Sequence, residues 1–323
     1  MINRLILAIT AAIILLSIVP VIAADQPARK ADIWIMPSPW PDGRCLRELF
    51  QKPNQWKNTR SKIDVLGYWA SLLNEQFKDD ELKSMFAKVD EWNLRMAMEV
   101  QVLKEYQQTG DLAFDISRKQ WDRFYSLGAK FNTIALDEPF FCVRHVIKKE
   151  NSYAVKETAD YIEKVRKQYP DMVIGDIEPY PALSTQELIY WVEALNAELS
   201  KRGVRGLDFI RLDVDWALFD KSDTVSWKGV RDFEDYCRKN GLKYSLIYWA
   251  SAYPYLQQQK KADERTWYVS LMHQGYDYIL QGGQPDEYVI ESWLDTPKKS
   301  LPEYSLDTFS GSALDFIRRI IGR

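Results

Sequence analysis

Short apolar runs alternate along the chain with longer segments in which apolar residues recur at helical spacing. The apolar runs are mostly short and rich in β-branched residues, as parallel strands buried on both faces should be. They predict eight strands, at Asp32–Met36, Ile63–Tyr68, Leu94–Val100, Thr133–Asp137, Val173–Ile177, Phe209–Asp215, Tyr244–Tyr248 and Val289–Trp293.

The segments between these runs predict helices. Ser184 and Glu187 fit a capping box, in which each side chain satisfies a free backbone N–H at the start of a helix. Helices are predicted from Asp80 onward and at Ser117–Phe131, Tyr153–Tyr169, Ser184–Lys201, Val230–Lys239, Asp263–Leu280 and Leu314–Ile321.

Strands that alternate with helices predict a parallel sheet with right-handed crossovers. Eight such units match a closed (β/α)8 barrel, which typically has about 250 residues. An open, doubly wound sheet is the rival, but the sequence has no Gly-rich nucleotide loop. We therefore predict the α/β class, with residues 25–323 forming a single (β/α)8 TIM barrel.

Residues 1–24 differ from the rest in composition. Arg4 precedes an uncharged apolar run from Leu5 to Val19, Pro20 breaks it, and small residues precede Asp25. This layout is typical of a secretory signal peptide, and the run is shorter than the roughly 20 residues that span a bilayer. We expect a secreted or periplasmic protein with no membrane anchor after cleavage.

Composition excludes several classes of protein. The 43 Lys and Arg residues nearly balance the 46 Asp and Glu residues, so the net charge of −3 gives no reason to expect nucleic-acid binding. Two histidines do not make a His-rich zinc site, and three cysteines do not make a disulfide scaffold. In an oxidising compartment Cys45 and Cys142 could still pair. We expect a monomer with no cofactor and no bound metal.

Acidic residues collect where the predicted strands end, and this is where the chemistry of TIM barrels takes place. These residues are Glu99, Asp137, Glu138, Asp176, Glu178, Asp213, Asp215 and Glu291. Because side chains alternate along a strand, Arg211 shares a face with Asp213 and Asp215, and we expect that face to point into the barrel. By the same alternation Asp176 aligns with Glu178, and Glu291 with Trp293, and we expect these acids to point into the barrel as well.

Aromatic residues, 13% of the chain, follow the same distribution. A sugar offers a C–H face that stacks on Trp or Tyr and hydroxyls that bond to carboxylates, so a cleft of acids and aromatics suits a carbohydrate. The predicted substrate contacts are Trp40, Tyr68, Trp69, Glu99, Asp137, Asp176, Tyr180, Arg211, Trp216, Tyr248, Trp249 and Trp293.

The segment Ala135–Pro139, which reads Ala-Leu-Asp-Glu-Pro, resembles the glycoside hydrolase TIM barrels, especially clan A. In that clan an Asn-Glu-Pro motif at the fourth strand places the acid/base Glu, so the resemblance implies this role for Glu138. Two features depart from the clan. Asp137 stands where Asn is usual, and the seventh strand with its flanks, Lys243–Trp249, carries no Glu where the clan has its nucleophile.

Cleavage of a glycosidic bond needs one carboxylic acid that protonates the leaving oxygen and a second carboxylate that attacks or activates water. We predict that Glu138 is the general acid. Asp213 or Asp215 is the preferred partner, with Glu178 and Glu291 as alternatives.

Two other functions remain open at this point. A divalent-metal-dependent sugar isomerase or lyase could hold its ion through Glu178, Asp213 and Glu291. A non-catalytic carbohydrate-binding protein on a degenerate barrel would explain the missing acid of the seventh strand.

Overall fold

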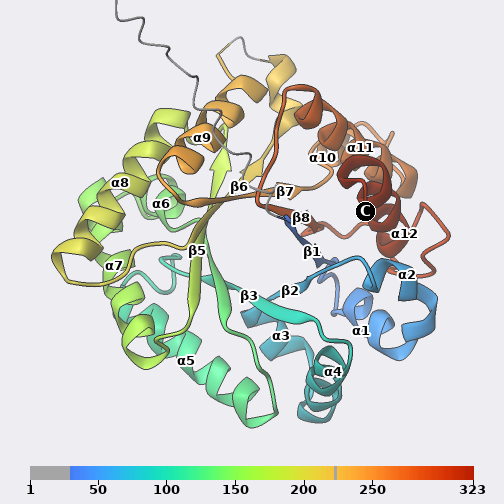
Figure 1. The fold of residues 1–323 in the computed structure, drawn as a ribbon, viewed down its shortest axis with the longest axis horizontal. Coiled ribbons are helices and arrows are strands. Elements are labelled where there is room, and N and C mark those ends of the chain that lie inside the picture. Colours follow the sequence, from blue (N-terminus) through green and yellow to red (C-terminus); the bar gives the residue numbers. More distant parts are fainter. Residues whose placement is uncertain (1–29, 222–223) are drawn as a thin grey trace, which may run out of the picture. The chain divides into compact units, whose positions relative to one another are not determined.

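Eight parallel strands pair in chain order and close into a barrel with helices around it (Figure 1). The computed structural model describes residues 30–221 and 224–323. The strands are β1 (Asp32–Met36), β2 (Val65–Trp69), β3 (Arg95–Gln101), β4 (Thr133–Asp137), β5 (Val173–Tyr180), β6 (Phe209–Val214), β7 (Lys243–Tyr248) and β8 (Glu287–Glu291). Because β1 pairs with both β2 and β8, the barrel has no open edge. This confirms the predicted single (β/α)8 barrel.

Two strands differ from their predicted bounds in ways that affect the site. Strand β5 continues past Ile177 to Tyr180, so Glu178 lies within the strand and not in the loop after it. Strand β8 begins at Glu287 and ends at Glu291, so Trp293 follows the strand.

The helices lie outside the strands, and most of them follow the predicted pattern. They are α1 (Arg44–Gln51), α2 (Lys57–Arg60), α3 (Ala70–Gln76), α4 (Asp79–Glu91), α5 (Gly110–Ser126), α6 (Pro139–Phe141), α7 (Asn151–Gln168), α8 (Thr185–Lys201), α9 (Trp227–Lys239), α10 (Ala252–Gln258), α11 (Glu264–Leu280) and α12 (Phe309–Phe316). Short 3-10 turns lie at Pro53–Trp56 and Trp216–Lys221, and π-helical turns at Cys142–Ile147 and Ile317–Ile321. Ser184 and Glu187 form the predicted capping box of α8.

Helix α5 is the clearest difference, because it was predicted at Ser117–Phe131 and begins at Gly110. Glycine is a poor helix former, so nothing in the sequence indicated a helix start at Gly110. Here the backbone of α7 lies so close that a Cβ at position 110 would stand 2.1 Å from the carbonyl oxygen of Glu157. The Gly110 N–H also donates to the Glu157 carboxylate at 3.0 Å. Glycine at this position therefore permits the close packing of α5 on α7.

The barrel interior is polar beneath its mouth. Arg211 of β6 is 1% exposed, and its Nη2 lies 3.3 Å from Oε2 of Glu287 in β8. Its Nε donates to the Ser245 hydroxyl at 2.8 Å, and its guanidinium lies 4.2 Å from the ring centroid of Trp34. Arg211 thus points inward, as predicted, and crosses the barrel to bind a strand that is not its neighbour.

The predicted signal peptide, residues 1–24, lies outside the residues that the structure describes. Among the described helices none is long and apolar enough to cross a membrane. Cys45, Cys142 and Cys237 are buried free thiols, so Cys45 and Cys142 do not form the disulfide that the sequence left open.

The Arg211–Glu287 pair gives a test of the barrel interior. Substitution Arg211→Met leaves the Glu287 carboxylate buried without its cation, and we expect the free energy of unfolding to fall by about 3–5 kcal/mol. The double variant Arg211→Met/Glu287→Leu removes both charges and should regain most of this loss. Urea unfolding followed by tryptophan fluorescence measures both values. A loss below about 1 kcal/mol in the single variant would show that the Arg211–Glu287 pair contributes little to the stability of the barrel.

Candidate active site

A cavity of about 410 Å³ opens among the carboxyl ends of the strands, the end of a TIM barrel at which active sites lie. We call it the acidic cavity. It is lined by Pro39, Trp40, Trp69, Leu72, Glu99, Gln101, Asp137, Glu138, Ile177, Asp213, Ile247, Glu291 and Trp293. Eight of the side chains predicted from sequence therefore meet in one place: Trp40, Trp69, Glu99, Asp137, Glu138, Asp213, Glu291 and Trp293.

Glu138 has an unusual backbone conformation directly after β4. Its φ of 49° and ψ of 46° lie in the left-handed region, which costs a residue with a side chain about 1–2 kcal/mol. The conformation is held from both sides, because the Glu138 N–H donates to the Ile177 carbonyl and the Glu138 carbonyl accepts from the Cys142 N–H. Pro139 follows as the first residue of α6. Such strain is common at functional sites, where it directs a side chain into a cavity.

Burial and mutual repulsion raise the pKa of the cavity carboxyls. Burial, with a smaller contribution from the charge of Asp137, raises the pKa of Glu138 to about 7. Burial likewise raises the pKa of Glu291 to about 8, although Arg211 beneath it acts in the opposite direction. The pKa of Asp213 is well above its ordinary value, because it is buried and because Glu138 and Glu291 lie close by.

Glu99 shows the same effect on the β3 side of the cavity. Burial raises the pKa of Glu99 well above its ordinary value, and the charges of Glu291 and Asp137 raise it further. The cavity carboxyls therefore act on one another, and we expect them to titrate as a set that shares protons.

Asp137 differs from the other acids because it has a cation beside it. Nζ of Lys104 lies 2.9 Å from Oδ2 of Asp137 and also donates to Sγ of Cys142 at 3.2 Å. Lys104, on the loop after β3, was missed from sequence because that loop has no helical or strand pattern that would place it. Two more residues of this side were also missed: Gln101 lines the cavity, and the exposed Tyr106 donates its hydroxyl to the Gln101 side chain.

Two exposed tryptophans form the opposite rim. Trp40, from the loop after β1, is 45% exposed, and Trp293, after β8, is 38% exposed. Nε1 of Trp40 donates to the Trp293 carbonyl at 2.9 Å. The ring of Trp249 packs against Trp293 with 4.7 Å between centroids, while its Nε1 donates to the Val214 carbonyl. Trp249 thus supports the rim from behind and does not line the cavity.

The predicted inward orientation of Asp176 and Glu178 is wrong. Ile177 of β5 lines the cavity, so its two neighbours point outward toward the helices. Asp176 accepts a hydrogen bond from Nε1 of Trp191 in α8 at 2.6 Å. Glu178 accepts from the backbone N–H groups of residues 140 and 141, at 2.7 Å and 3.0 Å, and so holds the start of α6 below Glu138.

The same alternation removes three predicted tyrosines from the cavity. Tyr68 and Tyr248 are fully buried beside the lining residues Trp69 and Ile247, and each faces the helix layer. Tyr180 lies on the outward face of β5, where its hydroxyl donates to the Ser226 carbonyl at 3.3 Å.

Three further predicted residues lie near the acidic cavity but outside its lining. Asp215 follows the end of β6 and accepts a hydrogen bond from the Tyr255 hydroxyl at 2.6 Å. Trp216 packs edge-on against His273 and lines a different surface hollow, between α10 and α11. Arg211 lies deeper in the barrel, bound to Glu287.

The arrangement of possible metal ligands gives no support to the metal-dependent isomerase or lyase. Within residues 30–221 and 224–323, no three His, Cys, Asp or Glu side chains are grouped so that they could hold a metal ion. Of the three ligands that the sequence suggested, Glu178 also uses both oxygens on backbone N–H groups.

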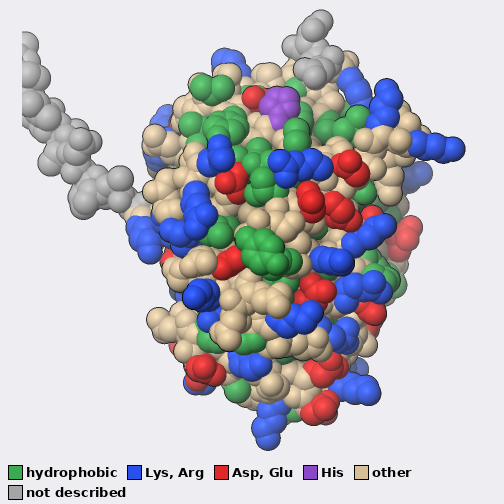
Figure 2. All heavy atoms as spheres, turned by 90° about the vertical axis from the view of Figure 1, so that its right-hand side faces the viewer, with side chains coloured by type: hydrophobic (Ala, Val, Ile, Leu, Met, Phe, Trp, Pro, Cys, Tyr) green, Lys and Arg blue, Asp and Glu red, His purple; other side chains and the backbone are tan. Residues whose placement is uncertain are grey.

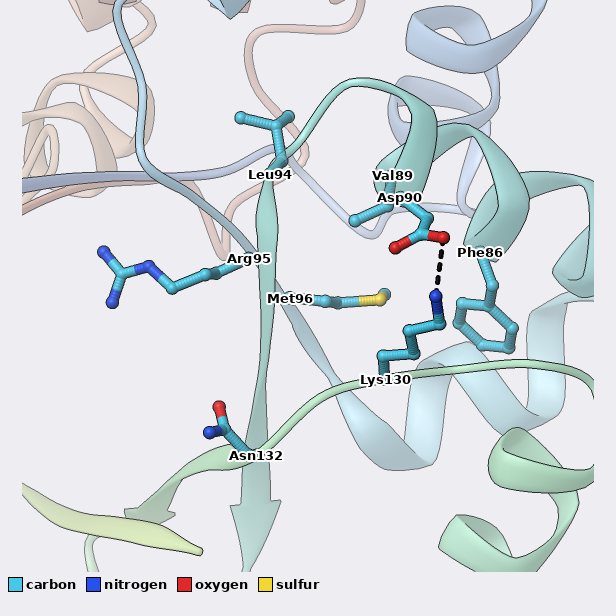
Figure 3. Close-up of a pocket in the computed structure, with 8 residues that line it drawn as sticks. All are labelled: Phe86, Val89, Asp90, Leu94, Arg95, Met96, Lys130 and Asn132. Atoms are coloured by element: carbon cyan, nitrogen blue, oxygen red, sulfur yellow. Dashed lines mark hydrogen bonds and ion pairs between the residues drawn. The ribbon is translucent and has the colours of Figure 1, made fainter. Parts of the chain in front are cut away.

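A second pocket lies at the amino ends of β3 and β4, on the side of the barrel away from the acidic cavity (Figure 3). Lys130 points toward Asp90 across it and is paired with it at 2.6 Å, while Arg95 points away and is paired with Asp32. Ion pairs at this end of a TIM barrel, away from the mouth, usually serve stability. On the face of the molecule that Figure 2 shows, basic and acidic side chains are interspersed.

Comparison with known proteins shows the fold alone. No protein family model matches the sequence, and no curated protein matches it. A glucosidase from Croceicoccus marinus superposes with a TM-score of 0.50 at 10% identity, over 81% of this chain and 62% of that one. A psychrophilic family 10 endo-β-1,4-xylanase gives 0.49 at 10% identity, over 88% and 96%.

The carboxyl transferase domain of Rhizobium etli pyruvate carboxylase with pyruvate gives a TM-score of 0.48 at 10% identity, over 81% of this chain. The match spans 40% of the carboxyl transferase chain. The closed barrel of eight parallel strands is a TIM barrel. That fold hosts many unrelated chemistries, so the function has to be argued from the acidic cavity.

The raised pKa of Glu291 predicts how stability depends on pH. Its carboxyl ionises near pH 4.5 in the unfolded chain and near pH 8 in the folded protein. The contribution of Glu291 to stability is therefore fully present below pH 4.5 and is lost as the pH rises toward 8. Glu291→Gln removes this loss. We expect the variant to unfold at the same urea concentration as the wild type near pH 4, and to be more stable by up to about 5 kcal/mol above pH 8. Equal stability of the two proteins at both pH values would contradict the raised pKa.

Lys104 predicts a shift in the titration of Glu138. Its positive charge lowers the pKa of Glu138, so Lys104→Met should raise that pKa above its value of about 7. Titration of ¹³C-labelled Glu side chains by NMR, with Glu138→Gln to assign the signal, measures the value. Lys104→Arg keeps the charge and serves as the control. An unchanged or lower pKa in Lys104→Met would show that Lys104 does not act on Glu138.

Proposed function

We propose that this protein is an exported, monomeric glycoside hydrolase that cleaves a glycosidic bond of a poly- or oligosaccharide. The observation that carries the proposal is the position of Glu138. Its strained backbone directs a carboxyl with a pKa of about 7 into a cavity that also holds Asp213 and three tryptophans. A carboxyl with this pKa is protonated often enough at neutral pH to act as a general acid.

The two required protonation states follow from the coupling among the acids. Neighbouring carboxyls cannot all ionise together, so near neutral pH the set contains protonated and ionised members. In the proposed reaction Glu138 gives its proton to the leaving oxygen of the glycosidic bond. Asp213, from β6, supplies the carboxylate that attacks the sugar or activates water. Asp215 is a weaker choice for this role, because its Oδ2 is bound by Tyr255.

The remaining lining residues suit the binding of a sugar. Trp40, Trp69 and Trp293 offer aromatic faces, and the hydrogen bond between Trp40 and Trp293 fixes two of them relative to each other. Gln101 and Glu99 offer polar groups to hydroxyls on the other side of the cavity.

One observation favours a second candidate, a carbohydrate-binding protein without catalysis. Strand β7 contributes Ile247 to the lining, an apolar residue on the strand that carries the nucleophile in clan A. If Asp213 does not replace that nucleophile, the cavity would bind a saccharide and leave it intact.

The test is a screen of oligosaccharides for release of reducing ends, followed by two substitutions. Glu138→Gln keeps the size of the side chain but removes its proton and charge, so we expect kcat to fall by about 10²–10⁴-fold with binding retained. Asp213→Asn should cause a comparable loss. The exposed residues Glu91 and Asp122 supply the matched controls Glu91→Gln and Asp122→Asn, which should keep full activity.

Two results would contradict the hydrolase. Unchanged kcat in Glu138→Gln would remove that residue from the chemistry. Saccharide binding by the wild type without cleavage, across the same screen, would favour the binding protein. Activity that a chelator abolishes would point instead to a metal-dependent enzyme.

A further inference from the structure

The acidic cavity contains more carboxyls than glycosidic cleavage needs. Two are required, one acid and one base or nucleophile. Within the described part of the chain, four lining carboxyls have no ion pair and no hydrogen bond from another side chain: Glu99, Glu138, Asp213 and Glu291. The cations nearby are engaged elsewhere, since Lys104 binds Asp137 and Arg211 binds Glu287.

Glu291 is the clearest example of a cavity carboxyl without a partner. It lines the cavity, its side chain is 2% exposed, and its Oε2 is buried without a hydrogen-bond partner. Oδ1 of Asp213 is buried and unpartnered in the same way. An unsatisfied buried acceptor costs about 1–3 kcal/mol, and more when it is charged. Such groups are retained in a cavity when a ligand satisfies them.

The kind of ligand follows from the charge and from the other lining groups. A metal ion needs several oxygens gathered around one point, and the described residues offer no such group. Neutral hydroxyls would supply hydrogen bonds but no positive charge to those carboxyls of the set that are ionised. An ammonium group supplies up to three strong donors together with a positive charge, and it is also attracted to the faces of tryptophans such as Trp40, Trp69 and Trp293.

We propose that the cavity recognises an amino sugar whose nitrogen is free and protonated, bound between the carboxyls of Glu291 and its neighbours and the tryptophan faces. This inference rests on the proposed function, because it names the substrate class of the same site. It predicts selection against the N-acetylated form of the same sugar, which has no positive charge and adds a bulky group.

Binding of an ammonium should also release protons. The positive charge lowers the pKa of the carboxyls around it, so those that hold a proton at neutral pH give it up. The groups that face Glu291 across the cavity and from below are Asp137, Glu138, Asp213, Glu99 and Arg211. Of these the carboxyls with raised pKa supply the protons, and a neutral sugar would leave them in place.

The experiment is isothermal titration calorimetry on Glu138→Gln, which should bind without cleaving. The probes are short glucosamine and galactosamine oligomers and the same oligomers fully N-acetylated. We expect the free-amine forms to bind at least about tenfold more tightly, in a salt-dependent manner. Glu291→Gln in the same background should reduce this preference about tenfold, whereas Asp122→Asn, which removes an exposed charge, should not. Titration in two buffers with different ionisation enthalpies measures proton release.

The outcomes separate this inference from the proposed function. Equal or tighter binding of the N-acetylated oligomers, or no binding of either free-amine oligomer, overturns the inference. If the wild type cleaves a neutral saccharide and shows no preference for the amine, the proposed hydrolase function stands and the amino-sugar inference is overturned. A free-amine preference that depends on Glu291, in a wild-type protein that cleaves none of the oligomers, would support the recognition and contradict the hydrolase.

Discussion

The closure of eight parallel strands into a ring determines which side chains can meet. Along each strand alternate residues point inward, so each strand offers only one or two positions at the mouth. Glu99, Asp213 and Glu291 occupy such positions on three strands, while Trp69, Ile177 and Ile247 occupy them on others. The residues next to these in the chain face the helices and serve packing, as Tyr68, Glu178 and Tyr248 do. The composition of the cavity is therefore a direct result of strand register.

Gathering like charges in this small space opposes folding, and other parts of the structure offset that cost. Arg211 places a positive charge below the cavity, and its hold on Glu287 fixes it there. Lys104 compensates Asp137 from the side. The other carboxyls avoid repulsion by keeping their protons to higher pH. The pKa of Glu138 is raised to about 7 and that of Glu291 to about 8. The strained backbone of Glu138 adds to the same cost, and the Ile177 and Cys142 hydrogen bonds maintain it.

The sequence was sufficient for the barrel and for much of the cavity lining. The alternation of apolar runs with helical segments predicted all eight strands, and the strand-end rule brought Glu138, Asp213 and Glu291 together. The sequence-based prediction failed where alternation alone does not say which of two neighbouring residues in a strand faces inward. In β5 the acids were assumed to face inward because they are charged, but Trp191 and the backbone of α6 satisfy them outside the barrel. Lys104 could not be found, because its contact with Asp137 depends on the path of an irregular loop.

The pairing of Arg211 with Glu287 also means that the barrel interior is not complete until the last strand, β8, is in place. Arg211 is contributed by the sixth strand, whereas its carboxylate partner and two cavity residues, Glu291 and Trp293, come from or follow the eighth. Until the last strand docks between β7 and β1, the arginine lacks its counter-charge and two strand edges stay unpaired. A growing or truncated chain that ends before β8 therefore holds an unneutralised cation and an incomplete mouth. The final strand thus completes the electrostatics of the core and the ligand cavity in one step.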